Sequence, residues 1–392
     1  MEPVEVKQGI YWVGGIDWDL RNFHGYITQR GSTYNAYLIV DEKIVLVDTV
    51  KHYLFDEMLA RIRKVVDPSK IDYIVANHVE MDHSGCLVGM AEIAEKAVVL
   101  TSPKGEEGLR RHFKKDLNFR IVQNGETVNI GKRDLQFFHM PMVHWPDSMA
   151  TYCPQEKLLL PNDAFGQHIA TAERFDDEVP FDILREEAAK YYANIVLPYG
   201  SQVQKVLHAL SSLEIDMIGP SHGIIWRSHI PDILAAYEKW ANNDTDKKAL
   251  IVYDTMWGST RKMAYALKDG LEECGIPVTM RNLELTHISD IMADVLESRA
   301  ILIGSPTLNK GMMPTIGALL TYLTGLCPKK RTGMAFGSYG WAEKSVGEIE
   351  EAMKAMKWDV PIDGPRIRYV PDPEELEEVR ETGKQLGAII NK

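Results

Sequence analysis

The second half of the chain alternates short apolar runs with longer stretches that repeat apolar residues at helical spacing. Residues 249–253 have the pattern of a buried strand, and residues 261–274 have that of a helix ending at Gly275. The same alternation predicts further strands at residues 278–285, 300–303, 333–337 and 366–369, and further helices at residues 288–297, 315–326, 346–356 and 373–389. Five strands that alternate with five helices predict a doubly wound parallel sheet of the α/β class.

In the first half, strand-like runs follow one another instead of alternating regularly with helices. They occupy residues 10–13, 34–40, 44–47, 73–76, 98–100 and 135–138, with hairpin turns expected at Asn124-Gly125 and Pro154-Gln155. Helical stretches lie between and after these runs, including a long one within residues 181–213. The pattern predicts two mixed sheets covered by helices and leaves the order of their strands open.

A polar stretch, residues 242–248, separates the two patterns. It follows a helix-like segment and precedes the first strand of the second half, as a short linker between domains does. A chain of 392 residues has room for two domains at roughly 100–200 residues each. We therefore predict one domain over residues 1–246 and a second over residues 247–392.

Charge and composition narrow the classes of partner. The chain carries 56 acidic and 44 basic residues, a formal net charge of −12, and such a surface repels the phosphates of nucleic acids. The N-terminus lacks the pattern of a signal peptide, and no apolar run approaches the roughly 18 residues of a membrane span. The four cysteines form no C-x-x-C pair, which disfavours a cysteine-ligated metal module. These features predict a cytoplasmic protein that binds neither nucleic acid nor membrane.

The densest chemical signal lies directly after the strand-like residues 73–76. Four side chains that bind metals fall within six positions there: His78, Glu80, Asp82 and His83. On an extended backbone the first three share one face, because side chains alternate with a period of two, and His83 follows from the start of the next helix. Adjacent buried charges need neutralisation, so this run predicts a metal site.

Three distant residues complete the predicted site, because each follows an apolar strand-like run: His144, Asp163 and His222. Four imidazoles and three carboxylates exceed the needs of one tetrahedral zinc and suit two metals of higher coordination number. Ligands rich in oxygen and without thiolate favour iron or manganese. Asp163 stands alone between the histidine groups and is the expected bridge. Three other histidines are expected either beside the ligands or in purely structural positions: His24, His139 and His168.

The second half carries a loop suited to a phosphate group. After the strand at residues 249–253 comes Thr255-Met256-Trp257-Gly258-Ser259-Thr260, and then a helix begins. Hydroxyl groups, backbone N–H groups and the helix N-terminus make an uncharged phosphate nest. The chain has neither G-x-G-x-x-G nor G-x-x-x-x-G-K-[ST] at this point, which disfavours dinucleotides and nucleoside triphosphates. A monophosphate held in this way predicts FMN.

Two further loops follow predicted strands of the same sheet, and ligands of doubly wound sheets bind beyond the carboxyl ends of the strands. The aromatic residues Trp257, Tyr339 and Trp341 are expected to line the flavin ring. Besides the phosphate loop, the predicted FMN-binding residues are Ser305, Pro306, Thr307, Leu308, Asn309, Ser338, Tyr339, Gly340 and Trp341.

Together these residues resemble the flavodiiron proteins, over essentially the whole chain. The resemblance implies a metallo-β-lactamase-like αββα sandwich followed by a flavodoxin-like domain. Glu80 is the most discriminating position, because related hydrolases usually have His there. The resemblance further implies that one iron binds His78, Glu80 and His144, that the other binds Asp82, His83 and His222, and that Asp163 bridges them. It places His24, Tyr26 and Tyr192 near the open metal positions.

The family resemblance implies reduction of dioxygen to water, or of nitric oxide to nitrous oxide, at the di-iron centre. Electrons would pass through FMN from a rubredoxin-type protein or a reduced deazaflavin. The implied assembly is a head-to-tail homodimer or a dimer of dimers, with each flavin facing the partner's irons.

Two other functions remain open at this stage. One is a zinc-dependent hydrolase of the β-lactamase superfamily with a regulatory flavodoxin domain, against which Glu80 and the many carboxylates argue. The other is an electron carrier whose metal site is only structural.

Overall fold

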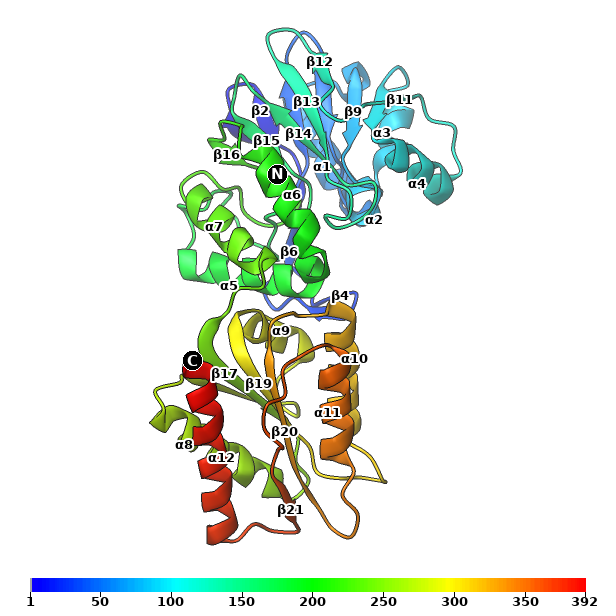
Figure 1. Ribbon diagram of the computed structural model, residues 1–392. Helices are drawn as coiled ribbons and strands as arrows, with labels where there is room; N and C mark the ends of the chain where they lie inside the picture. The colour runs from blue at the N-terminus through cyan, green and yellow to red at the C-terminus, as the bar shows by residue number, and fades with distance from the viewer. Residues whose placement is uncertain (1) are drawn as a thin grey trace. The chain divides into compact units, whose positions relative to one another are not determined.

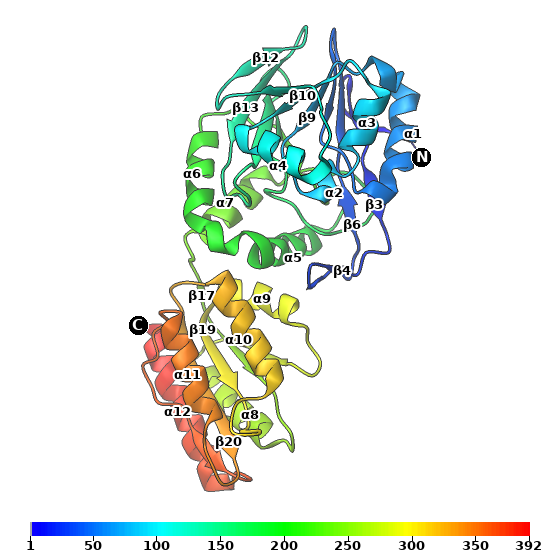
Figure 2. The ribbon, with the colours of Figure 1, turned by 90° about the vertical axis from the view of Figure 1, so that its right-hand side faces the viewer.

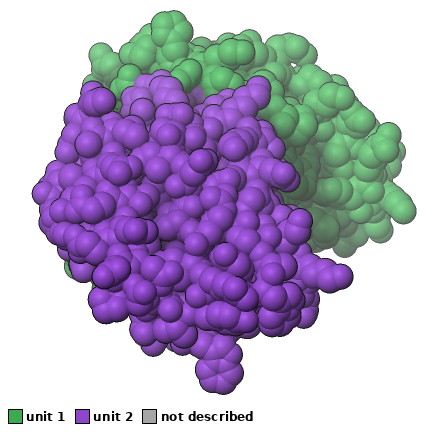
Figure 3. Space-filling model, turned by 60° about the horizontal axis from the view of Figure 1, so that its bottom comes forward, with its two compact units in different colours: residues 1–191, 201–238 green, residues 192–200, 239–392 purple. Residues whose placement is uncertain are grey.

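The computed structural model describes residues 2–392. The chain divides into two compact units, shown in separate colours in Figure 3. Unit 1 consists of residues 1–191 and 201–238, and unit 2 consists of residues 192–200 and 239–392. The contacts therefore divide the chain before residue 239, whereas the sequence places a domain boundary after residue 246.

Unit 1 contains two main sheets packed face to face (Figure 1). The first has the strand order β1-β2-β7-β8-β9-β10-β11 and the second has β12-β13-β14-β15-β16. The strands of the first sheet are β1 (Val4–Lys7), β2 (Ile10–Trp12), β7 (Tyr37–Val40), β8 (Ile44–Val47), β9 (Tyr73–Ala76), β10 (Val98–Thr101) and β11 (Phe119–Ile121). Those of the second are β12 (Thr127–Asn129), β13 (Asp134–His139), β14 (Met149–Cys153), β15 (Leu158–Leu160) and β16 (Met217–Ile218).

Alternation along the strands builds a separate core on each face of the first sheet. Val45 and Val47 of β8 point into the core between the two sheets, where they meet Phe137 of β13. Leu46, between them, points to the opposite face and packs with Met58 of a covering helix. Because both faces are buried, β8 is apolar at every position, as expected of a strand covered on both sides.

Helices cover the outer faces of both sheets (Figure 2). The outer face of the first sheet packs on α1, α3 and α4, whereas α6 and α7 lie outside the second. The helices are α1 (Phe55–Val65), α2 (Met81–Ser84), α3 (Leu87–Ile93), α4 (Pro103–Phe113), α5 (Phe181–Tyr191), α6 (Gly200–Leu210) and α7 (Ile230–Ala241), with 3-10 turns η1 (His52–Leu54) and η2 (Pro68–Lys70). This arrangement confirms the predicted αββα sandwich.

Two short hairpin-like pairs lie outside these sheets. β3 (Gly15–Asp17) pairs with β6 (Ser32–Tyr34), and β4 (Asn22–Phe23) pairs with β5 (Tyr26–Ile27). The turn of the second pair is His24-Gly25, with φ of 52° and 86°, as a two-residue hairpin turn requires.

The long helical stretch expected within residues 181–213 is interrupted. α5 ends at Tyr191 and gives way to a π-helical turn η3 (Tyr192–Val196) and a 3-10 turn η4 (Leu197–Tyr199) before α6 begins. Pro198 lies in this interruption, and proline cannot donate the backbone hydrogen bond that a continuous helix needs. The prediction of one long helix was therefore wrong at its centre.

Unit 2 is a five-stranded parallel sheet with the order β18-β17-β19-β20-β21 within residues 246–368. Helices α8 and α12 cover one face, and α9, α10 and α11 cover the other (Figure 1). The elements are β17 (Asp246–Tyr253), α8 (Ser259–Glu273), β18 (Val278–Asn282), α9 (Ile288–Glu297), β19 (Ser298–Gly304), α10 (Pro314–Leu326), β20 (Thr332–Tyr339), α11 (Ser345–Ala355), β21 (Arg366–Arg368) and α12 (Pro373–Asn391). The predicted doubly wound sheet is confirmed, although β17 begins inside the polar stretch expected to be a linker.

No helix within residues 2–392 has the length and apolar character needed to cross a membrane.

Candidate metal centre and flavin pocket

The first four candidate ligands come from the segment that follows β9. His78 and Glu80 lie in the connection after the strand, whereas Asp82 and His83 lie in α2. The extended backbone assumed for Asp82 is therefore wrong, because the helix begins directly after Glu80. The turn of the helix separates Asp82 and His83 from His78 and Glu80 and directs each pair to a different group of ligands.

The other three candidates follow strands of the second sheet. His144 lies between β13 and β14, Asp163 follows β15, and His222 follows β16. Adjacent strands that end at one edge of a sheet bring these residues to the segment after β9. The structure assembles all seven candidates into two groups, His78, Glu80, His144 and Asp163, and Asp82, His83 and His222.

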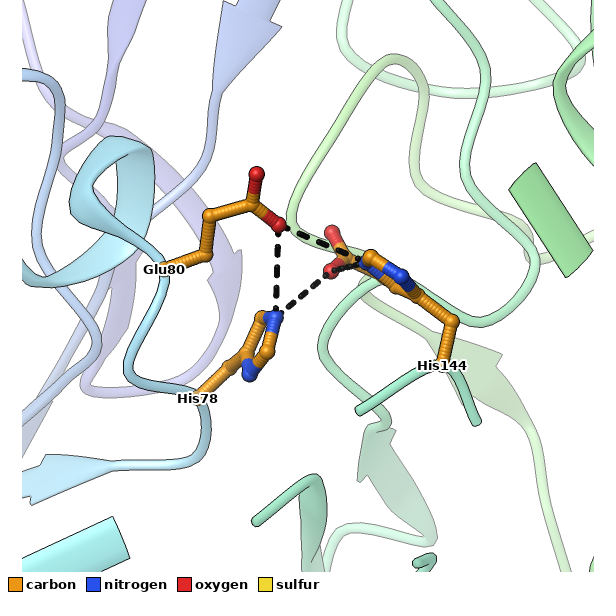
Figure 4. A group of neighbouring side chains, drawn as sticks. His78, Glu80 and His144 are labelled. Carbon is orange, nitrogen blue, oxygen red and sulfur yellow. Dashed lines mark hydrogen bonds and ion pairs between the residues drawn. The ribbon is translucent and has the colours of Figure 1, made fainter. Parts of the chain in front are cut away.

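Ligand atoms of the first group lie close enough to share one ion. His78 Nε2 is 3.5 Å from Glu80 Oε2, and His144 Nε2 is also 3.5 Å from Glu80 Oε2. Figure 4 shows His78 and Glu80 approaching from one segment and His144 from another. Two ligands each about 2.1 Å from a metal lie about 3.0–3.4 Å apart at ordinary coordination angles, so the spacing fits a common ion.

Asp163 faces both groups with different oxygens. Its Oδ2 lies 3.2 Å from His144 Nε2 and 3.6 Å from His78 Nε2. Its Oδ1 lies 3.0 Å from His83 Nε2 and 3.4 Å from His222 Nε2. A carboxylate placed in this way has the geometry of a bridge between two ions.

The second group is completed by Asp82. Its two oxygens lie 3.4 Å from His83 Nε2 and 3.3 Å from His222 Nε2. All three members are buried. Their donors are two imidazoles and one carboxylate, joined by the near oxygen of Asp163.

Several buried atoms of the two groups lack a hydrogen bond, which tests whether metals fit. Among the described residues, His78 Nε2, both Asp82 oxygens, His83 Nε2 and Asp163 Oδ1 are buried without a hydrogen-bond partner. Leaving such polar atoms unsatisfied is costly, and each of them can bind a metal once it is deprotonated. The residues present therefore fit a pair of bound metal ions.

Two histidines are held by partners outside the groups, which the sequence did not indicate. Asp147 Oδ2 lies 2.8 Å from His78 Nδ1 and also accepts from the Val79 N–H at 2.8 Å. The carbonyl of Thr33 lies 2.8 Å from His222 Nδ1. Such partners fix the ring orientation and leave Nε2 as the metal-binding nitrogen. No local pattern marks Asp147 or a backbone carbonyl, so only the structure reveals them.

The buried carboxylates of the two metal groups need positive charge beside them. Burial disfavours an ionised carboxylate, but His83 and His144 hold the pKa of Asp163 well below its usual range. Burial lowers the pKa of His83, yet Asp82 and Asp163 raise it to about 9. Without metals, protons on imidazoles therefore supply the charge that bound cations would supply.

Some of the residues expected near the ligands lie beside them, and others do not. His24 Nε2 lies 3.5 Å from Glu80 Oε1, and its side chain is 76% exposed. His168 is buried with its ring 4.8 Å from that of His222, and the buried Tyr26 ring lies 5.1 Å from His168. His139 instead makes its side-chain hydrogen bond with the Val122 carbonyl, at 3.0 Å, and belongs to neither metal group.

The structure places Tyr191, which was not predicted, beside the metal groups. Tyr192 belongs to unit 2, where its ring lies 5.2 Å from that of Trp240. Tyr191 ends α5 in unit 1, and its ring lies 5.9 Å from His222 and 5.1 Å from His168. The helical period distinguishes these neighbours only when the exact end of the helix is known.

The predicted flavin loops meet in one pocket of unit 2, with a volume of about 730 Å³. They follow β17, β19 and β20, at the carboxyl edge of the sheet. The predicted residues that line the pocket are Thr255, Met256, Trp257, Ser259, Pro306, Thr307, Leu308, Asn309, Ser338, Tyr339, Gly340 and Trp341. Lys310, Ala342, Tyr369 and Val370 line it as well and were not predicted. Gly258 and Ser305 lie in the same loops and Thr260 lies in the first turn of α8, but none of the three lines the pocket.

The loop after β17 is shaped for an anion. Gly258 has a φ of 88° immediately before α8, and its N–H donates to Thr255 Oγ1 at 3.0 Å. Thr260 Oγ1 lies 3.2 Å from Ser338 Oγ, which joins the first turn of α8 to the end of β20. A helix N-terminus beside an apolar pocket of this size fits a flavin mononucleotide.

Comparisons with known proteins agree with both halves of this description. Residues 33–223 match the ODP family beta lactamase, and residues 251–383 match the flavodoxin family. The chain is 46% identical to the nitric oxide reductase of Moorella thermoacetica, with 99% of each chain covered. It is 39% identical to the rubredoxin-oxygen oxidoreductase of Megalodesulfovibrio gigas, covering 100% of this chain and 98% of the relative.

The solved structures extend the likeness to the whole chain. The crystal structure of the flavodiiron protein from Giardia intestinalis matches with a TM-score of 0.98 at 36% identity, covering 100% of this chain and 97% of that one. This chain belongs to the flavodiiron protein family. The flavodiiron chain is accordingly an oxidoreductase, with FMN and a non-haem di-iron centre as its cofactors. The zinc-hydrolase alternative is not supported, because the relatives named above are oxidoreductases.

Proposed function

We propose that this flavodiiron protein reduces dioxygen to water, nitric oxide to nitrous oxide, or both, at two irons held by the seven residues of the metal groups. The observation that carries this proposal is Asp163, which directs one oxygen to each group, 3.2 Å from His144 Nε2 and 3.0 Å from His83 Nε2. A hydrolase with one zinc has no need of such a bridge or of seven ligands.

Each residue of the site has a definite task in this proposal. When bound, the irons and the flavin supply the electrons that reduction of the gas requires. Asp147 and the Thr33 carbonyl fix the rings of His78 and His222, so that each presents Nε2. The burial of Asp82, His83 and His222 keeps bulk water from this end of the site.

The flavin pocket supports the remaining parts of the proposal. Trp257 and Trp341, at the pocket, are 94% and 90% exposed. Apolar rings left so open are typical of surfaces that another protein covers, which supports a head-to-tail homodimer or dimer of dimers. The name of the relative from M. gigas supports a rubredoxin-type donor, with a reduced deazaflavin as the second candidate. The four cysteines are free thiols, in keeping with a reducing cytoplasmic location.

Metal content and gas consumption test the function together. We expect anaerobically reconstituted protein to bind about two irons per chain and to consume dioxygen or nitric oxide when FMN is reduced. Replacing a ligand in the first group, His144→Ala, should lower the iron content and abolish turnover. His139→Ala is the matched control, because His139 bonds the Val122 carbonyl instead of joining a metal group; it should keep both irons.

Zinc retained in preference to iron, with no consumption of either gas, would contradict the proposal. Equal iron loss in the two histidine variants would show that the seven residues do not form the site.

A further inference from the structure

A half-buried lysine beside the metal groups has an unusual environment. Lys51 Nζ lies 5.5 Å from the ring centre of Phe23, 5.6 Å from that of Tyr34 and 5.5 Å from that of Tyr53. No carboxylate within residues 2–392 forms an ion pair with this ammonium. Its attraction to the three rings is therefore its main interaction, and we call these rings the Lys51 cage.

Two rings of the cage and the backbone of the lysine belong to segments of unit 1 outside the β4–β5 hairpin. Tyr34 is fully buried at the end of β6, and the Tyr53 hydroxyl donates to Asp17 of β3. The carbonyl of Lys51 accepts from the Leu54 N–H at 2.9 Å and from Cys86 Sγ at 3.6 Å. These hydrogen bonds fix the backbone of Lys51, which carries the ammonium.

The third ring belongs to the β4–β5 hairpin. In the described residues its two strands pair only with each other, Asn22 with Ile27 and Phe23 with Tyr26. The hairpin belongs to neither large sheet, and side chains contribute to its placement: Lys190 Nζ lies 5.1 Å from the ring centre of Tyr26. Phe23 lies 5.2 Å from the ring of His168 and 6.1 Å from that of His222.

The residue after Phe23 touches a candidate metal ligand. His24 has its ring 4.4 Å from that of Phe23 and its Nε2 3.5 Å from Glu80 Oε1. Glu80 keeps 15% of its side chain exposed beside this hairpin, whereas the side chains of Asp82 and Asp163 are each 3% exposed. Whatever fixes Phe23 therefore also fixes His24 over the more open end of the metal groups.

We propose that Lys51 is a positioning residue that holds the β4–β5 hairpin over the metal site by binding the face of Phe23, and so keeps His24 against Glu80. This inference rests on the proposed function for its purpose, since the covered groups are the iron ligands of that proposal. The contact itself is independent of which gas is reduced, and its test does not require turnover.

Hydrogen exchange of the full, iron- and flavin-loaded chain measures directly how firmly the β4–β5 hairpin is held. Lys51→Met keeps the length of the side chain and removes its charge, and it should speed exchange of the backbone amides in residues 22–28 about fivefold to tenfold. Lys51→Arg keeps a cation over the rings and should stay within about twofold of the wild type. The matched control is Lys70→Met, an exposed lysine of η2, which should leave the hairpin unchanged.

A double-mutant cycle assigns the effect to Phe23. Phe23→Leu should speed hairpin exchange as Lys51→Met does, and the double variant should add little to either single change. Loss of ferrous iron to an excess of chelator should also be faster in Lys51→Met by about the same factor, because Glu80 is then less well covered.

Unchanged hairpin exchange in Lys51→Met would overturn the proposal. So would additive effects in the double variant, or equal acceleration in β7 and β8, which would show a general loss of stability instead. A protein that binds no iron and consumes no gas contradicts the proposed function but leaves the exchange result to decide the role of Lys51.

Discussion

At the scale of single residues, the site depends on what surrounds each ionisable group. His83 and His168 are both buried histidines near His222, yet their pKa values move in opposite directions. Burial lowers both, but Asp82 and Asp163 raise the pKa of His83 to about 9. Burial and the neighbouring His222 hold the pKa of His168 well below its usual range, so this imidazole stays neutral. Among the described residues, His83 has two carboxylates as close partners, whereas His168 has none. This difference distinguishes a candidate metal ligand from a residue that only lies beside the ligands.

Glu187 of α5 provides a pH prediction at this scale. Burial raises the pKa of its carboxyl to about 7, against the lowering effect of Lys190 and of Arg30, whose Nε lies 3.0 Å from Oε1. The folded protein thus holds a proton that the unfolded chain releases at lower pH. The stabilisation is complete below the ordinary pKa of glutamate and is lost as the pH rises through about 7.

Glu187→Gln removes this titration. Relative to the wild type, the variant should gain about 2–3 kcal/mol in free energy of unfolding between pH 5 and pH 8. Urea unfolding at the two pH values measures this, with Glu186→Gln, an exposed neighbour, as the control expected to show no gain. An equal pH dependence in wild type and Glu187→Gln would refute the assignment.

At the scale of elements, the ends of strands and the beginnings of helices place the chemistry. The loop between β17 and α8 reverses direction through Gly258, whose φ of 88° is unfavourable for any residue with a Cβ atom. The N-terminus of α8 can then face a phosphate. The same logic places Glu80 immediately before α2, Asp82 and His83 within α2, and the other ligands after β9, β13, β15 and β16.

A pair of glycine substitutions tests the phosphate loop. Gly258→Ala should cost about 1–2 kcal/mol of backbone strain and weaken FMN binding about tenfold, measured by titrating flavin-free protein with FMN and following fluorescence quenching. Gly317→Ala lies within α10, where an added Cβ meets nothing within 4 Å. It should stabilise the protein by about 0.5–1 kcal/mol and leave FMN affinity unchanged. Equal FMN affinity in both variants would argue against a phosphate site at Gly258.

At the scale of the whole molecule, the two candidate cofactor sites lie in different compact units. The seven metal-group residues all belong to unit 1, and every residue lining the flavin pocket belongs to unit 2. Each unit has its own apolar core, the one between the two sheets in unit 1 and the one between the sheet and α8 and α12 in unit 2. A ligand that binds only a folded unit stabilises that unit.

Removal of the cofactors one at a time should therefore separate two unfolding transitions. In calorimetry, removing iron should lower the midpoint of one transition and removing FMN that of the other. A ligand present at about 100 times its dissociation constant contributes about 2.7 kcal/mol to the unit that binds it. A single transition that shifts with either cofactor would instead show that the units unfold together.

The sequence predicted those features that depend on neighbours along the chain. Hydrophobic period identified the strands and helices of unit 2, and polar residues after apolar runs identified all seven members of the metal groups and most of the flavin pocket. It did not place the start of α2 at Met81, because the run from His78 to His83 is compatible with either an extended or a helical backbone. It did not anticipate the break after Tyr191 either, because periodicity continues across Pro198.

Residue type and local spacing thus predict the kinds of ligand, the order of the elements and the class of cofactor. The contacts that hold the ligands came from the folded structure: Asp147 holds His78 across 69 residues, and the Thr33 carbonyl holds His222 across 189. The folded structure also decided that Tyr191 lies beside His222, whereas Tyr192 lies beside Trp240. These contacts join segments that only the packing of two sheets brings together, and no local pattern encodes which distant partner will arrive.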